Sequence, residues 1–118
     1  MRFQDLLAYK KSFALAMRIY EISKSFPKEE RYSLTDQIRR SSRSVSANIA
    51  ESYAKRLYPK YFINKLTASD AENLETLVWM EYAMECQYIK KEIFIKCFIQ
   101  KELLEVAVAR VLMNRVMV

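Results

Sequence analysis

The sequence predicts an all-α protein, an antiparallel up-down-up-down four-helix bundle that forms one domain over residues 1–118. Three observations lead to this prediction. The chain has no glycine, the residue on which hairpin turns, β-bulges and phosphate-binding loops rely. Its apolar residues recur at the three- and four-residue spacing of a buried helical face. Its two prolines, Pro27 and Pro59, stand where long helices would be separated.

The first helix is predicted over residues 3–25. The expected buried face consists of apolar residues spaced three or four apart: Leu6, Tyr9, Phe13, Met17 and Tyr20. The residue before a proline avoids helical backbone, so this helix should end before Phe26 and Pro27. A second helix is predicted over residues 33–56, and we expect Ser33 to cap it with Asp36 as a capping-box partner.

The third helix is predicted over residues 59–87, because Pro59 suits the first turn of a helix. Its inward stripe should contain Phe62, Leu66, Asn73, Leu77, Met80 and Met84. A fourth helix is predicted over residues 91–117. Its buried side should contain Phe94, Cys97, Phe98, Lys101, Leu104, Val108, Val111 and Leu112. Short connections make successive helices antiparallel neighbours.

The second helix should present three different surfaces. At about 100° per residue, its inward face consists of Leu34, Ile38, Ser41, Val45, Asn48, Ile49 and Ser52. Arg39, Arg40 and Arg43 lie roughly opposite. The small residues Ala47, Ala50 and Ala54 continue that side, either as a strip for close approach of another helix or as a solvent face with good helix propensity. We expect Asn48 to be a hydrogen-bonded polar group that fixes helix register.

Positive charge is concentrated in the first half of the chain. Residues 1–60 hold thirteen Lys/Arg and six Asp/Glu, a net +7, whereas residues 61–118 hold seven and eight, a net −1. This asymmetry indicates a basic surface that could attract a polyanion. The candidate nucleic-acid-binding residues are Arg39, Arg40, Arg43, Lys55, Arg56 and Lys60.

Other roles are open for these residues. The arginines could form ion pairs with Glu72 and Glu75, or they could simply be solvated. Tyrosines lie among the last three basic residues, and they could stack on unpaired bases or pack half-buried in the bundle. They are Tyr53, Tyr58 and Tyr61.

The sequence favours a protein that is not an enzyme. It has no histidine, which excludes a Ser-His-Asp triad and imidazole metal ligands. Two Glu-x-x-Glu spacings, Glu72/Glu75 and Glu102/Glu105, lack the histidines of di-iron bundle sites. We therefore expect no catalytic residue, no metal and no cofactor. Cys86 and Cys97 suit buried thiols of a cytoplasmic protein, and no apolar run reaches the roughly 18 residues of a membrane span.

Several motifs carry a family resemblance. They are QIRR at residues 37–40, SVSANIAE at residues 44–51, and the set Glu72, Glu75, Thr76 and Trp79. With these motifs the chain resembles the bacterial four-helix-bundle family of 23S rRNA intervening-sequence proteins, which is similar in fold to the accessory protein of diversity-generating retroelements. The resemblance covers residues 3–89 and continues weakly through the last helix. Many members have glycine where Ser52 stands here.

The resemblance implies a structural role for five motif residues: Asn48, Glu51, Glu72, Glu75 and Trp79. It also implies a homo-oligomer, a ring-like homopentamer with a basic surface, in a family whose biochemical role is unsettled. The leading hypothesis is an oligomeric binding protein that presents a basic surface to RNA or DNA. The alternative is a homo-oligomeric scaffold with a protein partner and no nucleic-acid binding.

Overall fold

The computed structural model describes the backbone of residues 1–117 and the side chains of residues 1–114. Helices account for every regular element of this described part. The long helices are α1 (Leu7–Ser23), α2 (Leu34–Ala54), α3 (Pro59–Glu85) and α4 (Lys91–Met117), and the short 3₁₀ turns are η1 (Phe3–Asp5) and η2 (Lys28–Glu30). The predicted all-α, four-helix architecture is confirmed.

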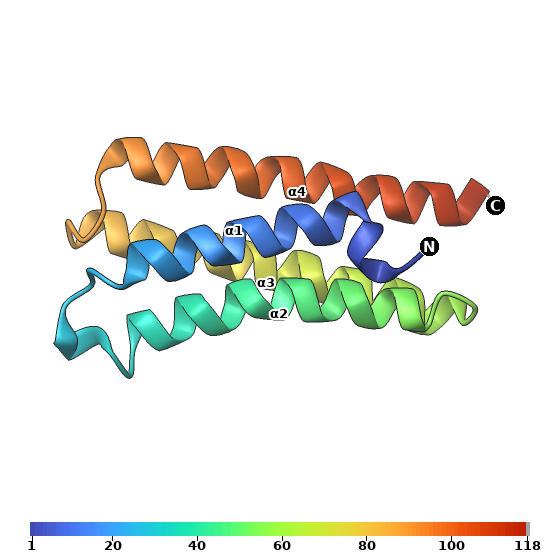
Figure 1. Cartoon of the computed structure of the whole chain (residues 1–118), viewed down its shortest axis with the longest axis horizontal. Coiled ribbons are helices and arrows are strands. Elements are labelled where there is room, and N and C mark those ends of the chain that lie inside the picture. Colours follow the sequence, from blue (N-terminus) through green and yellow to red (C-terminus); the bar gives the residue numbers. More distant parts are fainter. Residues whose placement is uncertain (118) are drawn as a thin grey trace.

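The four long helices lie side by side along the 46 Å axis of the molecule, which measures 25 and 21 Å in the other directions (Figure 1). Each helix packs against two neighbours, in the cycle α1–α2–α3–α4–α1. Consecutive helices are joined at alternating ends and therefore run in opposite directions, with both chain termini at the same end (Figure 1). None of the helices in the described part combines the length and the hydropathy that a membrane span requires.

The first helix is shorter than predicted at both ends. Phe3–Asp5 form the separate turn η1, and Leu6 is extended at ψ 130°. The Asp5 carboxylate holds this turn by accepting a hydrogen bond from the Arg2 backbone amide at 3.1 Å. At its other end α1 stops at Ser23, and the chain continues to Pro27 through shorter-range turn hydrogen bonds.

The predicted buried face of α1 is wrong for Phe13 and Met17, which are 53% and 44% exposed. The residues that face the core are mostly small: Ala8, Ser12, Leu15, Ala16, Ile19 and Ser23. Small side chains allow α1 to approach α2 closely, and the Ser46 hydroxyl donates to the Ser12 hydroxyl at 3.0 Å. The larger Phe13 and Met17 therefore stand at the edge of this contact, while Leu6, Tyr9 and Tyr20 are half-buried.

The predicted cap of α2 is also wrong. The Ser33 hydroxyl does not cap the helix but donates to Glu30 Oε1 at 2.6 Å. The same carboxylate oxygen accepts a hydrogen bond from the Leu34 backbone amide at 3.3 Å, so Glu30 provides the acceptor for one of the unpaired amides in the first turn of α2. The helix ends at Ala54, two residues earlier than predicted.

The inward faces of α2, α3 and α4 follow the predicted stripes. In α2 every predicted core residue is buried except Asn48, which is half-buried. In α3 the stripe holds, with Leu77 and Met84 half-buried, but the helix ends at Glu85 because Gln87 takes a positive φ of 64°. In α4, which has the predicted bounds, the buried Lys101 ammonium donates to Glu105 at 2.9 Å.

Asn48 is hydrogen-bonded, as predicted, but its hydrogen bonds to Ser44 stay within α2 and other polar groups link the helices. Its amide nitrogen donates to the Ser44 carbonyl, at 2.9 Å, within the same helix. The asparagine that links helices is the fully buried Asn73 of α3, which donates to the Lys101 carbonyl of α4 at 3.2 Å. A buried hydrogen bond of 2.8 Å between Ser41 and Thr76 links α2 to α3.

Candidate nucleic-acid interface

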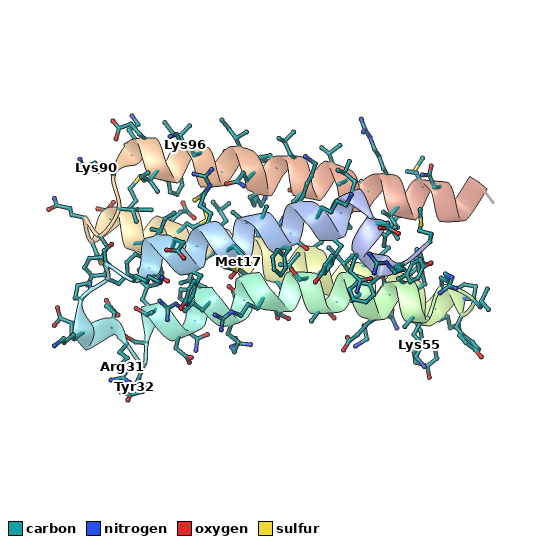
Figure 2. All side chains as sticks on the ribbon, in the orientation of Figure 1. Met17, Arg31, Tyr32, Lys55, Lys90 and Lys96 are labelled. Carbon is teal, nitrogen blue, oxygen red and sulfur yellow. The ribbon has the colours of Figure 1, made fainter. Side chains whose placement is uncertain are left out.

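The three predicted arginines lie together in a groove along the first half of α2. This arginine groove has a volume of about 460 Å³ and is lined by Arg31, Tyr32, Thr35, Asp36, Arg39, Arg40 and Arg43. Figure 2 shows Arg31 and Tyr32 projecting at the end of the bundle where the α1–α2 connection enters α2. Four guanidinium groups face one carboxylate, so the groove carries an excess of positive charge.

Arg39 and Arg43 are positioned by a tyrosine. Both guanidinium groups lie over the ring of Tyr20 on α1, at 4.8 and 5.6 Å from its centroid. Arg39 Nε also donates to the Ser23 hydroxyl at 2.8 Å. Cation–π contacts orient these groups without neutralising them. Their positive charges therefore remain available to an anion.

Arg40 is the arginine for which the predicted pairing with Glu75 is confirmed. Its Nη2 lies 3.5 Å from Glu75 Oε2 and 3.2 Å from the Gln37 amide oxygen. Both side chains of the ion pair are substantially exposed, and such pairs contribute about 0–1 kcal/mol to stability. Within the described part of the chain, Arg39 and Arg43 have no carboxylate at ion-pair distance.

The other predicted basic residues lie at the opposite end of α2. Lys55 and Arg56 occupy the α2–α3 connection, and Lys60 lies in the first turn of α3. Figure 2 shows Lys55 far from Arg31 and Tyr32. Lys55 is twelve positions after Arg43 in the sequence, which corresponds to about 18 Å at 1.5 Å per helical residue. The six candidates thus form two basic clusters and not one continuous site.

Tyrosines in the second cluster are covered by cations. Lys55 Nζ lies 5.9 and 5.7 Å from the ring centroids of Tyr58 and Tyr61. The Arg56 guanidinium lies 4.2 Å from that of Tyr53. Both Tyr58 and Tyr61 are 59% exposed, so they are not the half-buried packing residues that the alternative interpretation describes. Tyr53 is half-buried.

The alanine strip is divided by the structure. Ala47 and Ala50 line an apolar groove of about 420 Å³ between α1 and α2, together with Phe13 and Met17. Met17 is visible between these two helices in Figure 2. Ala54 is exposed at the end of α2 and lies outside this groove. Ala47 is exposed, and Ala50 is half-buried beside α1.

Comparison with known proteins bears on the identity of this bundle. A family model described as "23S rRNA-intervening sequence protein" matches residues 4–108. The chain belongs to this family. The family membership confirms the resemblance seen in the QIRR and SVSANIAE motifs.

A solved structure agrees with the intervening-sequence assignment. The chain is similar to a protein of unknown function from the S23 ribosomal protein family of Bacteroides thetaiotaomicron, with 28% identity and a TM-score of 0.81. The similarity covers 92% of this chain and 96% of that one. No match was found among curated proteins.

In this intervening-sequence protein, the motif glutamates have separate roles. Glu51 pairs with Lys65 at 2.9 Å between α2 and α3, where both side chains are exposed. Glu75 accepts from Trp79 Nε1 at 3.3 Å as well as pairing with Arg40. The Oε2 atom of Glu72 is buried without a hydrogen-bond partner among the described residues. Glu72 does not pair with an arginine there.

Two lining residues of the arginine groove, Arg31 and Tyr32, were missed by the sequence analysis. The Arg31 guanidinium lies 5.2 Å from the centroid of the Tyr32 ring. Both residues precede α2 and have no place on a helical wheel. Their position in the sequence, a few residues before the QIRR motif, could have identified them. A connection that leads directly into α2 must lie beside the first turns of that helix.

Acidic and thiol side chains are the potential metal ligands of this family member. No group of three or more Cys, Asp or Glu residues in that part of the chain is placed to hold a metal ion. Both cysteines are free thiols. Cys97 is buried, and burial raises the pKa of its thiol, but Cys86 is exposed, contrary to prediction.

Proposed function

We propose that this protein is a non-enzymatic, oligomeric binding protein that presents the arginine groove to RNA or DNA. The observation that carries the proposal is the groove itself, in which four arginines accompany one aspartate. Arg40 is paired with a carboxylate, and Tyr20 holds two of the others in place. A sequence without histidine further supports a binding role over catalysis.

Contact would be made mainly with phosphate groups. A guanidinium group can donate two parallel hydrogen bonds to one phosphate, and desolvated arginine forks recognise phosphates better than lysine does. Phosphate contacts fix the position of a nucleic acid but carry little sequence information. The second cluster, Lys55, Arg56 and Lys60, would engage a separate stretch of the same polyanion about 18 Å along α2.

The test is a titration with single- and double-stranded RNA and DNA at two salt concentrations. Binding should be seen at low salt and should weaken steeply as salt rises, because counterions released from phosphates drive association. All four nucleic acids should bind with little dependence on base sequence. A lack of binding to every one of them at low salt would refute the proposal.

A homo-oligomeric scaffold is the second candidate function, and an apolar stripe on α4 favours self-association. Ile95, Ile99, Leu103 and Val106 recur at helical spacing and are between 44% and 52% exposed. Large apolar patches on a protein surface commonly mark interfaces. In this proposal the stripe buries itself against another copy, and the family resemblance favours five subunits.

Light scattering tests the oligomer. We expect a mass of about 70 kDa, five times the 14.0 kDa of one chain, at micromolar concentration. The double substitution Ile99→Glu and Leu103→Glu should lower this mass, whereas Leu57→Glu, in the exposed α2–α3 connection, should leave it unchanged. A monomeric wild-type protein would rule out both the ring and a scaffold built on it.

A further inference from the structure

We propose that a second cavity, beside the arginine groove, holds one unpaired nucleobase of a single-stranded nucleic acid whose phosphates lie over the arginines. This inference rests on the proposed function and names the class of nucleic acid. The cavity, here called the aromatic pocket, has a volume of about 640 Å³, within the range of small-molecule sites. It lies where the α1–α2 connection and the start of α2 meet the last turns of α3.

Three aromatic side chains line the aromatic pocket: Tyr32, Trp79 and Tyr82. The rings of Trp79 and Tyr82 lie 5.9 Å apart at an angle of 37°, and the hydrogen bond from Trp79 Nε1 to Glu75 fixes the indole. Tyr82 is 57% exposed and Tyr32 is 82% exposed. Exposed aromatic faces of this kind are the surfaces on which unpaired bases stack in single-strand-binding proteins.

The aromatic pocket and the arginine groove adjoin each other. Tyr32 lines both cavities, and the Arg31 guanidinium lies over its ring. Gln37 lines the pocket and accepts a hydrogen bond from Arg40, which lines the groove. Phosphates bound by the arginines would therefore hold the attached bases beside the pocket.

An organic cation is the other common guest of aromatic cavities, so the charged groups around the pocket matter for the choice of ligand. Glu30 lines the pocket, but one of its oxygens accepts from Ser33 and a backbone amide, and the other from Tyr88 at 2.8 Å. Glu75 is paired with Arg40. Both carboxylates thus have partners within the protein but keep their charge, and Glu81 and Glu85 lie beside Tyr82. The arginines of the adjoining groove oppose binding of a cation and favour a base that is attached to phosphate groups.

Two polar groups remain to read the edge of a base. The Gln37 amide nitrogen and the Tyr82 hydroxyl have no partner among the described residues, although both side chains line the pocket. An amide nitrogen donates hydrogen bonds, and a phenol hydroxyl both donates and accepts. A flat, uncharged base with donors and acceptors on its edge matches these groups and the aromatic rings.

Trp79 provides a direct test, because it is the single tryptophan of the chain and its emission reports this pocket alone. The probes are a single-stranded DNA 12-mer of adenines and an abasic 12-mer with the same phosphates. Anisotropy of a labelled strand measures binding, and Trp79 emission measures occupation of the pocket. The adenine strand should bind and quench Trp79, whereas the abasic strand should bind more weakly and leave the emission unchanged.

Matched variants on α3 separate the pocket from the phosphate contacts. Tyr82→Ala should weaken binding of the adenine strand about 5- to 140-fold, the effect of losing a stacked base, without changing binding of the abasic strand. Leu74→Ala is the control, because Leu74 is on the same helix and also 57% exposed. It should leave both strands unaffected.

The possible failures differ in what they overturn. Equal binding of both strands without quenching would refute the base pocket and leave the proposed phosphate contacts intact. Absence of binding by either strand would refute the proposed function and the pocket with it. A change in Trp79 emission with choline chloride but not with the adenine strand, at equal ionic strength, would show a cation site instead.

Discussion

Glu30 shows how much one side chain contributes at the start of α2. Its carboxylate accepts hydrogen bonds from Ser33, from Tyr88 and from the Leu34 amide, and these bonds lower the pKa of Glu30 below 4.5. The same contact raises the pKa of Tyr88 to about 12. Glu30 thus links the α1–α2 connection both to the first turn of α2 and to Tyr88 in the α3–α4 connection.

The signs of these two pKa shifts define a pH window. Glu30 favours the folded state above pH 4.5, and this contribution is lost as pH falls through its lowered pKa. Tyr88 favours the folded state below its ordinary pKa of 10.0, and its contribution is lost as pH rises from there towards 12. The contact should therefore stabilise the protein between about pH 4.5 and pH 10.

Glu30→Ala should reveal this window in urea denaturation. We expect a loss of about 1 kcal/mol in the free energy of unfolding at pH 7, typical of a removed helix cap. The loss should shrink as pH falls below 4.5, where the wild-type carboxylate becomes protonated. Glu29→Ala is the control, and an equal effect of both substitutions would contradict the role given to Glu30.

The contact between α3 and α4 contains a carboxylate that works against stability. Burial, and secondarily the charge of Glu105, raise the pKa of Asp70, while Lys101 opposes them. Asp70 Oδ1 has no hydrogen-bond partner among the described residues. The folded state therefore favours the protonated form of Asp70. The protein is more stable while Asp70 is protonated at low pH, and this advantage is lost as pH rises through the raised pKa of Asp70.

Asp70→Asn should therefore stabilise the bundle at neutral pH. We expect a gain in the free energy of unfolding at pH 7, because the amide removes a charge that burial and Glu105 disfavour. The gain should disappear at low pH, where Asp70 is itself neutral. Thermal unfolding at several pH values measures both effects, and a destabilised Asp70→Asn protein at pH 7 would show that the carboxylate is needed as a charge.

Whole helices could be predicted from the sequence because long apolar stripes and prolines mark them. The inward faces of α2 to α4 follow directly from spacing. The inward face of α1 could not be predicted from spacing. Phe13 and Met17 are large apolar residues and were therefore expected in the core, but the close contact with α2 is made by the small residues Ser12 and Ala16. The capping role of Glu30 was hidden for another reason, since it depends on a 3₁₀ turn between the helices.

In the candidate site as well, the arrangement of residues within one helix could be predicted from the sequence, whereas contacts between helices could not. Spacing alone placed Arg39, Arg40 and Arg43 on one side of α2, and they line one groove. Spacing could not show that Tyr20, on another helix, supports two of them. Contacts between residues distant in sequence depend on how the helices pack, which no single periodicity encodes.

At the scale of the whole molecule, the bundle separates its basic residues along the 46 Å axis. The arginine groove lies at the end that holds the α1–α2 connection, and Lys55 lies towards the other (Figure 2). Lys90 and Lys96 lie at the same end of the long axis as Arg31 and Tyr32, but at the start of α4 and not beside α2 (Figure 2). Three positive charges can therefore be removed either from the arginine groove or from the start of α4, and the effects on nucleic-acid binding can be compared.

The salt dependence of nucleic-acid binding by two matched triple variants tests the central claim most directly. One variant carries Arg39→Gln, Arg40→Gln and Arg43→Gln; the other carries Lys90→Gln, Lys91→Gln and Lys96→Gln, with the same loss of charge. For single-stranded RNA, each lost phosphate contact should reduce the slope of log K against log salt by about 0.7. We predict a reduction of about 2 for the arginine variant and little change for the lysine variant, with helicity retained in both. Equal losses in the two variants would contradict a site in the arginine groove.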